Sequence, residues 1–230
     1  MTSIANVRKS LRDTRYMRTL SRVRDEFAIQ CNLYVTDQCN LDCAYCTEYD
    51  NSKPHPPLDQ VKAWLDHMVE LGTVRVALAG GEPLSHPDIV EIVRYARAIG
   101  LATSMTTNAF LLTAESLKRL EEAGLEVMQI SIDRMTPSKT TRKSLKSIAG
   151  KIDMVAASGI KLHLTGVICK DTLDECLEVL DYGLKRGIPS EVRLVHAGPD
   201  QLMRVDPGER AKVLHVIDTM ITRKRRGERV

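Results

Sequence analysis

The sequence is poor in aromatic residues and has no long apolar run. It contains one Trp, two Phe and six Tyr among 230 residues, too few for the aromatic platforms on which proteins stack single-stranded nucleic acid. Charged residues interrupt every apolar run before the roughly 18 residues that a membrane helix needs. The N-terminus is basic but has no apolar segment typical of a secretory signal. These absences predict a cytoplasmic protein with no nucleic-acid partner and no membrane span.

The sequence also has no strong net charge of either sign. It contains 33 Lys and Arg and 30 Asp and Glu, so the net charge is +3. A chain of this length can bury about 70% of the surface that its unfolded form exposes, so it needs no disulfide bonds to fold. The six cysteines are therefore expected to be reduced, which favours metal binding over disulfide bonds. Cys169 and Cys176 match no motif and are expected to be buried thiols.

Apolar runs and helical stripes alternate along the chain after the first 25 residues. Each run is followed by apolar residues at helical spacing, as in Leu58, Val61, Leu65 and Met68. Six strand–helix units predict parallel strands joined by right-handed crossovers. A complete eight-fold barrel needs about 250 residues, so we expect an α/β fold with an incomplete, open (β/α)6 barrel. The predicted strands cover residues 28–36, 74–80, 101–107, 127–133, 161–168 and 190–197.

The chain is expected to form one core domain at residues 26–230, preceded by a basic helical appendage at residues 1–25. Basic residues recur in the appendage at helical spacing, which predicts either a solvated face or a docking surface for an acidic partner. The residues at that spacing are Arg8, Arg12, Arg15 and Arg22.

Three cysteines follow the first predicted strand in the segment Cys39-Asn-Leu-Asp-Cys43-Ala-Tyr-Cys46. Three thiolates on one loop can point at one centre, and their softness selects zinc, copper(I) or an iron–sulfur cluster. A structural zinc site needs four ligands. His55 is one candidate for the fourth, whereas Cys31 lies about 26 Å away along an extended strand. Three ligands on a cubane cluster leave one iron open, as a catalytic cluster requires, so the spacing favours iron–sulfur over zinc or unligated thiols.

The CxxxCxxC spacing, with Tyr45 before the last cysteine, resembles the signature of the radical S-adenosylmethionine (SAM) superfamily. The resemblance covers roughly residues 28–197 and extends to segments of the molybdenum-cofactor cyclase and peptide-modifying branches. No cysteine follows Cys176, so the auxiliary-cluster cysteines of those branches are missing. The further matching motifs are Gly80-Gly81-Glu82-Pro83, Thr107-Asn108 and Ser131-Ile-Asp133.

This resemblance implies that Cys39, Cys43 and Cys46 hold a [4Fe-4S] cluster whose open iron binds SAM. Reductive cleavage of SAM would then give a 5′-deoxyadenosyl radical that abstracts hydrogen from a small molecule or peptide. The resemblance also implies an electron donor such as a flavodoxin or ferredoxin. It assigns SAM binding to Gly80, Gly81, Glu82, Pro83, Asn108, Ser131, Asp133, Gly166 and Ile168.

All of these candidates lie at the C-terminal ends of predicted strands, where parallel barrels gather their functional residues. Simpler roles stay open for several of them. The Gly80-Gly81 pair could form only a tight turn, Asp133 could cap the loop that follows it, and Asn108 could serve turn geometry.

Basic residues surround the predicted start of the helix after the fourth strand, where the helix dipole disfavours them. We therefore expect an anionic substrate group near Arg134, Arg142 or Lys143, with Lys170 and His196 as further rim candidates. The alternative is a solvated basic turn in which Ser138 and Thr140 cap the helix. Thr113 and Asp171 are expected to cap the helices that follow them.

Two other functions stay open at this stage. One is an activase that installs a glycyl radical in a protein partner, since such enzymes are comparably short and carry one cluster. The other is a non-catalytic zinc or iron–sulfur binding module.

Overall fold

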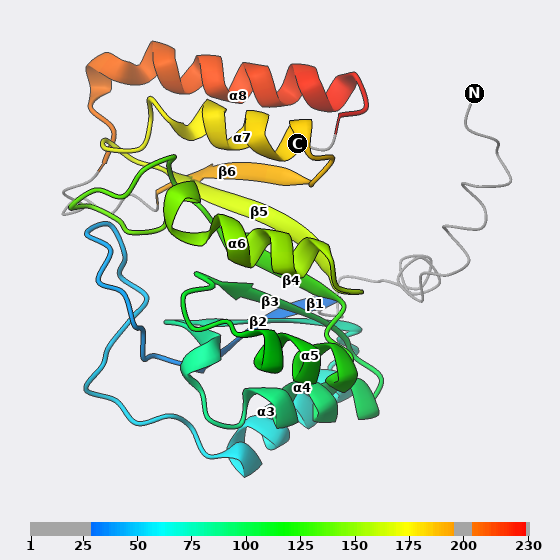
Figure 1. The fold of residues 1–230 in the computed structure, drawn as a ribbon. Coiled ribbons are helices and arrows are strands. Elements are labelled where there is room, and N and C mark those ends of the chain that lie inside the picture. The colour runs from blue at the N-terminus through cyan, green and yellow to red at the C-terminus, as the bar shows by residue number, and fades with distance from the viewer. Residues whose placement is uncertain (1–28, 196–203, 229–230) are drawn as a thin grey trace, which may run out of the picture.

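Parallel strands alternate with helices in the computed structural model, which describes residues 29–195 and 204–228 (Figure 1). The strands are β1 (Gln30–Thr36), β2 (Arg75–Gly80), β3 (Ala102–Thr107), β4 (Val127–Ser131), β5 (Lys161–Ile168) and β6 (Ser190–Leu194). The helices are α3 (Leu58–Glu70), α4 (Ile89–Ala98), α5 (Ala114–Ala123), α6 (Leu145–Ala156), α7 (Cys176–Lys185) and α8 (Arg210–Arg225). Two short 3₁₀ turns, η1 (Pro83–Ser85) and η2 (Pro207–Glu209), complete the described elements.

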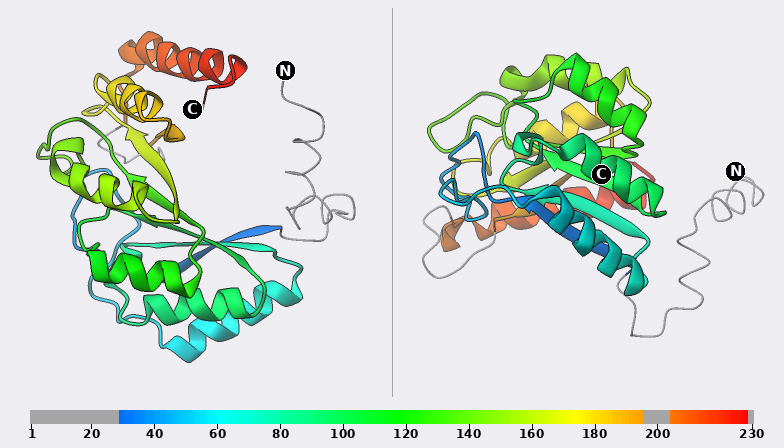
Figure 2. Two further views of the ribbon diagram at one scale, coloured as in Figure 1. Left: turned by 45° about the vertical axis from the view of Figure 1, so that its right-hand side comes forward. Right: turned by 90° about the horizontal axis from the view of Figure 1, so that it is seen from below.

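The six strands form one sheet in the order β1-β2-β3-β4-β5-β6, and every neighbouring pair is parallel. The two end strands, β1 and β6, do not pair with each other, so the sheet stays open. Figures 1 and 2 show the helices on one side of the curved sheet. This arrangement confirms the predicted open (β/α)6 barrel with parallel strands.

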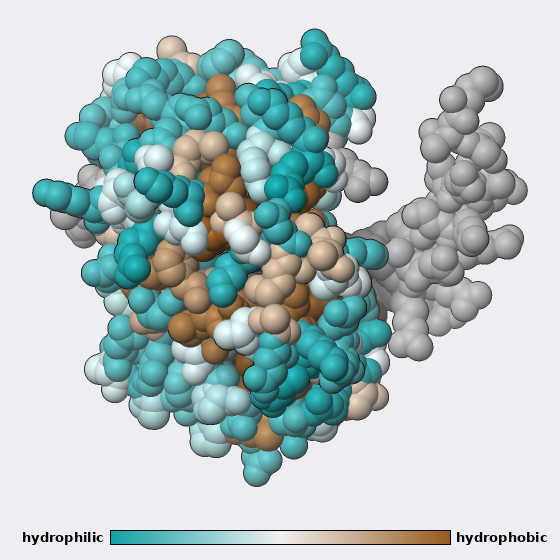
Figure 3. Space-filling view, viewed as in Figure 1, coloured by the Kyte–Doolittle hydropathy of each residue, from teal (hydrophilic) through white to brown (hydrophobic). Residues whose placement is uncertain are grey.

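Alternating burial along the strands shows which side faces the helices. In β5, Leu162, Leu164 and Ile168 are buried, whereas Thr165 and Val167 between them are only partly buried. The buried set packs against apolar helix stripes such as Val61 and Leu65 of α3. On the helical face in Figure 3, hydrophilic side chains cover most of the outer helix surfaces, and apolar side chains show between the helices. Burial of these stripes therefore fixes each strand's register.

The N-terminal cap predicted from the sequence is confirmed for α5, whereas α6 and α7 begin at other residues than predicted. Thr113 caps α5 and forms a reciprocal capping box with Ser116, as expected. The N-cap of α6 is Ser144, so the prediction that Ser138 and Thr140 cap this helix was wrong. Asp171 does not cap α7, which begins later at Cys176. In both cases the chain continues as an irregular connection past the first side chain that could cap a helix, and the helix begins further along the chain.

Two expectations fall outside the described residues, namely the basic N-terminal helix at residues 1–25 and the rim residue His196. Among the described residues, no helix is both long enough and apolar enough to cross a membrane.

Candidate functional site

An open cavity with about 620 Å³ of empty space lies at the C-terminal ends of the first four strands. The three clustered cysteines line it together with many of the residues singled out from the sequence: Gly80, Gly81, Glu82, Asn108 and Ser131. Side chains from four different connections therefore meet at one rim.

The cysteine loop is held in a compact shape by its own contacts. The amide of Cys46 donates to the carbonyl of Cys43 at 2.9 Å, and the amide of Cys39 donates to the Asn51 side chain at 2.8 Å. Leu41 and Tyr45 are buried between the cysteines, so the thiols alternate with apolar anchors. All three cysteines of this compact loop contribute to the cavity lining.

The two fourth-ligand candidates lie elsewhere. The Cys31 sulfur contacts the Thr73 hydroxyl at 3.3 Å, near the start of β1 and away from the cavity. The His55 ring is bonded to the Thr36 hydroxyl at 2.7 Å and packs 5.2 Å from the His86 ring. Neither residue lines the cavity.

The three cysteines fit an iron–sulfur cluster by the chemistry of their donor set. All are free thiols, and soft sulfur ligands on one loop suit such a cluster. Burial raises the pKa of both the Cys39 and Cys46 thiols. Because burial disfavours isolated thiolates, a positively charged group is needed in this cavity to hold the sulfurs deprotonated.

The two glycines at the end of β2 allow two backbones to touch. A Cβ on Gly80, whose φ is +134°, would lie 2.1 Å from the Thr36 carbonyl oxygen, and one on Gly81 would lie 2.3 Å from the Gln38 carbonyl oxygen. The amides of Gly81 and Glu82 donate to those same carbonyls at 2.9 and 2.7 Å. The glycines thus join the end of β2 to the start of the cysteine loop.

Glu82 joins the ends of β2 and β3. Its buried carboxylate accepts hydrogen bonds from the Thr107 hydroxyl at 2.6 Å and from the amides of Asn108 at 2.7 Å and Leu84 at 3.0 Å. Burial raises its pKa, and these donors oppose the rise. Pro83 opens the η1 turn, and the Asn108 side chain donates to the Asn40 side chain at 2.8 Å. Glu82 therefore positions the cavity wall through its hydrogen bonds.

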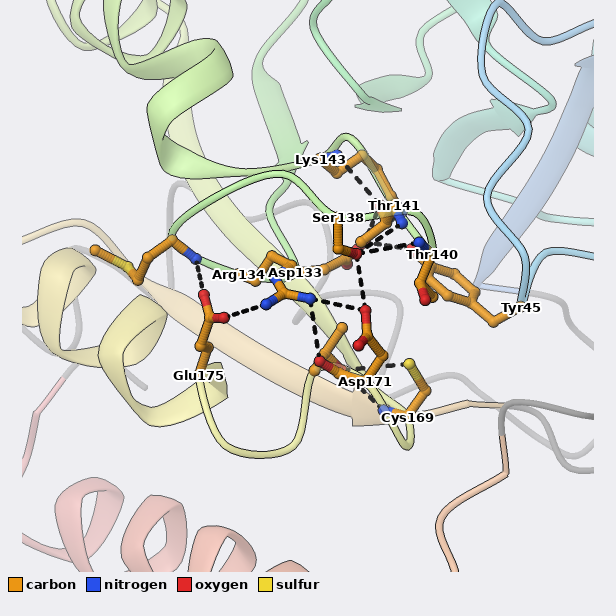
Figure 4. Close-up of polar contacts among 12 residues, drawn as sticks. Tyr45, Asp133, Arg134, Ser138, Thr140, Thr141, Lys143, Cys169, Asp171 and Glu175 are labelled. Carbon is orange, nitrogen blue, oxygen red and sulfur yellow. Dashed lines mark hydrogen bonds and ion pairs between the residues drawn. The ribbon is translucent and has the colours of Figure 1, made fainter.

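Asp133 lies behind the cavity wall, although Ser131 lines the cavity. The buried Asp133 carboxylate accepts hydrogen bonds from the Tyr45 hydroxyl and from the Thr141 hydroxyl at 2.9 Å (Figure 4). It also accepts one from the Val167 amide at 3.1 Å. All of these partners are protein groups. Asp133 therefore links three neighbouring segments, and its contact with SAM stays a prediction.

Neither Gly166 nor Ile168 lines the cavity. A Cβ on Gly166 would lie 2.4 Å from the Ile132 carbonyl oxygen, so this glycine permits close strand packing. Ile168 belongs to the apolar cluster beneath α7 and α8. Because successive strand residues point to opposite faces, Val167 is the residue that packs toward the cysteine loop. Ile168 therefore packs on the helix side of β5, and its contact with SAM stays a prediction.

Arg134 does not present a free guanidinium at the rim. It forms ion pairs with Asp171 at 2.7 Å and with Glu175, and its side chain is 14% exposed (Figure 4). The Ser138 hydroxyl also donates to Asp171 at 2.7 Å, and the Met135 amide donates to Glu175 at 2.7 Å. Two carboxylates thus match the charge of Arg134, and its role in binding an anionic substrate stays a prediction.

The other basic candidates differ in placement. Arg142 is exposed, and its guanidinium lies 5.4 Å from the centre of the Phe110 ring. Lys170 is more than half exposed and pairs with Asp206 at 3.2 Å. Lys143 lines the cysteine cavity and pairs with Asp133 at 3.4 Å.

The sequence did not point to several residues of the cavity and its network, among them Glu48 and Thr141, nor to the inward position of Lys143. No periodicity marks them, because they belong to irregular connections. The one available signal was Tyr45, whose aromatic position in the cysteine motif predicts a buried anchor.

Residues 33–183 match the family model described as the radical SAM superfamily. One similar curated protein is the PqqA peptide cyclase of Bradyrhizobium diazoefficiens, which is 41% identical over 43% of this chain and 27% of its own length. Another is the mouse (Mus musculus) molybdenum cofactor biosynthesis protein 1, 32% identical over 72% of this chain and 28% of its own length. The chain therefore spans little more than a quarter of either relative.

Among solved structures, Streptococcus suis SuiB bound to S-adenosylmethionine is similar in fold. It has a TM-score of 0.69 and 18% identity, and the match covers 95% of this chain and 54% of that protein. SuiB has also been solved with its precursor peptide SuiA. The likeness shows that the open parallel sheet and its surrounding helices follow the same architecture.

Proposed function

This chain belongs to the radical SAM superfamily, and from that premise we propose that it binds a [4Fe-4S] cluster and cleaves SAM to begin hydrogen abstraction from an organic substrate. One observation carries the proposal: Cys39, Cys43 and Cys46 share a single cavity with the Gly80-Gly81-Glu82 turn and Ser131. The membership also implies iron–sulfur and SAM chemistry in general, and it disfavours a non-catalytic zinc module.

The three cysteines would hold the cluster, which supplies one electron to break the bond between the SAM sulfur and C5′, giving methionine and a 5′-deoxyadenosyl radical. Asn108 and Ser131, on the same cavity wall, would orient SAM through their polar side chains. Glu82 would keep the β2 and β3 ends in register for this contact, because its carboxylate bonds to both.

The chain also limits water around the cysteines. Leu41 and Tyr45 are buried on the cysteine loop, and Phe110 and Val167 pack against them. A dry wall of this kind strengthens electrostatic interactions inside the cavity. We propose that it protects the radical from quenching at the protein side of the site.

The substrate is proposed to be a peptide or a small organic molecule. SuiB is solved with a precursor peptide and a curated relative is named for a peptide it cyclises, which supports the first class. Exposed Arg142 is the rim cation proposed to meet an anionic substrate group, since it makes no ion pair among the described residues. A flavodoxin or ferredoxin is the proposed electron donor.

Anaerobic reconstitution tests the proposal. The wild-type protein should bind about four irons per chain and release 5′-deoxyadenosine from SAM under a strong reductant. Cys43→Ala should lose both, because one of three cluster ligands is gone. Cys31→Ala and Cys176→Ala are matched controls, since neither sulfur lines the cavity. A colourless wild-type protein with one zinc, or turnover by Cys43→Ala, would contradict the proposal.

A further inference from the structure

Lys143 places a buried cation in the wall of the cysteine cavity. Its side chain is 13% exposed, its ammonium is 3.4 Å from the Asp133 carboxylate, and it lies 5.0 Å from the centre of the Tyr45 ring. Burial alone lowers the pKa of Lys143, but the charge of Asp133, followed by that of Cys43, raises it beyond its ordinary value. The ammonium therefore stays charged at neutral pH.

The loop that carries Lys143 is fastened directly to the cysteine loop. The Ala44 amide donates to the Thr140 carbonyl at 2.9 Å, and the Cys43 sulfur contacts the Thr141 hydroxyl at 3.4 Å. The Tyr45 hydroxyl donates to Asp133, as Figure 4 shows. Burial and the Asp133 charge raise the pKa of Tyr45, so the phenol keeps its proton for this bond. These contacts fix the ammonium relative to the sulfurs.

The ammonium-bearing side chain lines the same cavity as the ligand thiols. Lys143, Cys39, Cys43 and Cys46 all contribute to its wall. A fixed charge in a water-poor wall is screened by salt much less than a surface charge.

We propose that Lys143 is a positioning residue that raises the reduction potential of the iron–sulfur cluster bound by Cys39, Cys43 and Cys46. This inference rests on the proposed function. Reduction adds one electron to the cluster and breaks no bond, so the site gains one negative charge. A cation fixed beside the cysteines stabilises that more negative state, and nearby charge is one of the factors that set such potentials.

The test is a redox titration of the reconstituted cluster without SAM, followed by electron paramagnetic resonance, with dithionite as the reductant. Lys143→Gln should shift the midpoint potential to a more negative value at equal iron content. Lys143→Arg should stay near the wild type, because it keeps the charge. Lys146→Gln is the matched control, since Lys146 is exposed on the first turn of α6.

An unchanged potential in Lys143→Gln with four irons loaded would overturn the inference, even if SAM binding were weakened. If Lys143→Gln does not load a cluster, Lys143→Met decides, because it also removes the positive charge and keeps an unbranched side chain. A shift to a more negative potential would support the inference, and no shift or a positive one would overturn it. A wild-type protein that binds no cluster would instead contradict the proposed function.

Discussion

The two halves of the rim use their polar residues in different ways. At the ends of β2 and β3, Gly81, Glu82 and Asn108 line the cavity, and their hydrogen bonds hold the cavity wall together. At the ends of β4 and β5, Asp133 and Arg134 are turned into networks with other protein groups. Protein groups match the buried carboxylate in both halves, and the difference is that Glu82 lines the cavity whereas Asp133 does not.

The lengths of the connections account for this difference. The η1 turn starts three residues after β2 ends, so its path is set by the glycines and by Glu82. The connection from β4 to α6 spans residues 132–144 and has no helix of its own. A long irregular connection must satisfy its own polar groups, and here Asp133 and Arg134 supply the partners.

The largest expected effect is on stability, and it comes from the close contact between Gly81 and the Gln38 backbone at the end of β2. Gly81→Ala should lower the free energy of unfolding by about 3 kcal/mol, because the new Cβ would lie 2.3 Å from the Gln38 carbonyl oxygen. Gly150→Ala is the control. Its Cβ would meet nothing within 4 Å on α6, so helix propensity should raise stability by about 0.5–1 kcal/mol. Denaturant melts measure both, and equal effects would contradict the packing argument.

The second-largest expected effect tests whether the ion pairs of Arg134 stabilise the fold. Arg134→Met should lower the free energy of unfolding by about 2 kcal/mol, because Asp171 and Glu175 lose a shared partner. A double-mutant cycle with Glu175→Gln should show coupling between the two sites. Additive effects would mean that the ion pair contributes no stability, and the two rim halves would then differ less than the geometry indicates.

Titration of Glu82, in the β2–β3 half of the rim, should make the free energy of unfolding depend on pH. Burial raises its pKa, so the folded state binds more protons than the unfolded state above the ordinary value of 4.5. The free energy of unfolding should therefore fall as the pH rises from 4.5 through the raised pKa. The slope should be about 1.4 kcal/mol per pH unit between the unfolded and folded pKa values.

Glu82→Gln should flatten this part of the stability curve, because the titrating group is gone. Glu115→Gln is the control, since it removes an exposed carboxylate in the first turn of α5. Urea melts across the pH range compare the three proteins. A Glu82→Gln curve parallel to that of the wild type would show that Glu82 does not titrate in this window.

The contrast between the two rim halves also explains what the sequence could predict. Alternating apolar residues located β5 at 161–168, the same bounds as in the structure, because one face of every strand must be buried. The cysteine and glycine motifs located residues that line the cavity through their resemblance to the radical SAM signature. The sequence did not indicate that Ile168 packs beneath α7 and α8. It also did not indicate that Lys143 lines the cavity, because the path of residues 132–144 follows hydrogen bonds between distant segments.

The smallest stability effect belongs to Arg142. This side chain is exposed and contacts the Phe110 ring at 5.4 Å, an interaction worth about 0.5 kcal/mol at a solvated site. Arg142→Gln should therefore leave the denaturant midpoint and iron content nearly unchanged, in contrast to Arg134→Met. Its effect should appear in binding: an anionic substrate should bind Arg142→Gln more weakly, and the difference should shrink at high salt because exposed charges are screened. Substrate titrations at low and high ionic strength measure this. Unchanged affinity at low salt would mean that Arg142 does not contact the anionic group of the substrate.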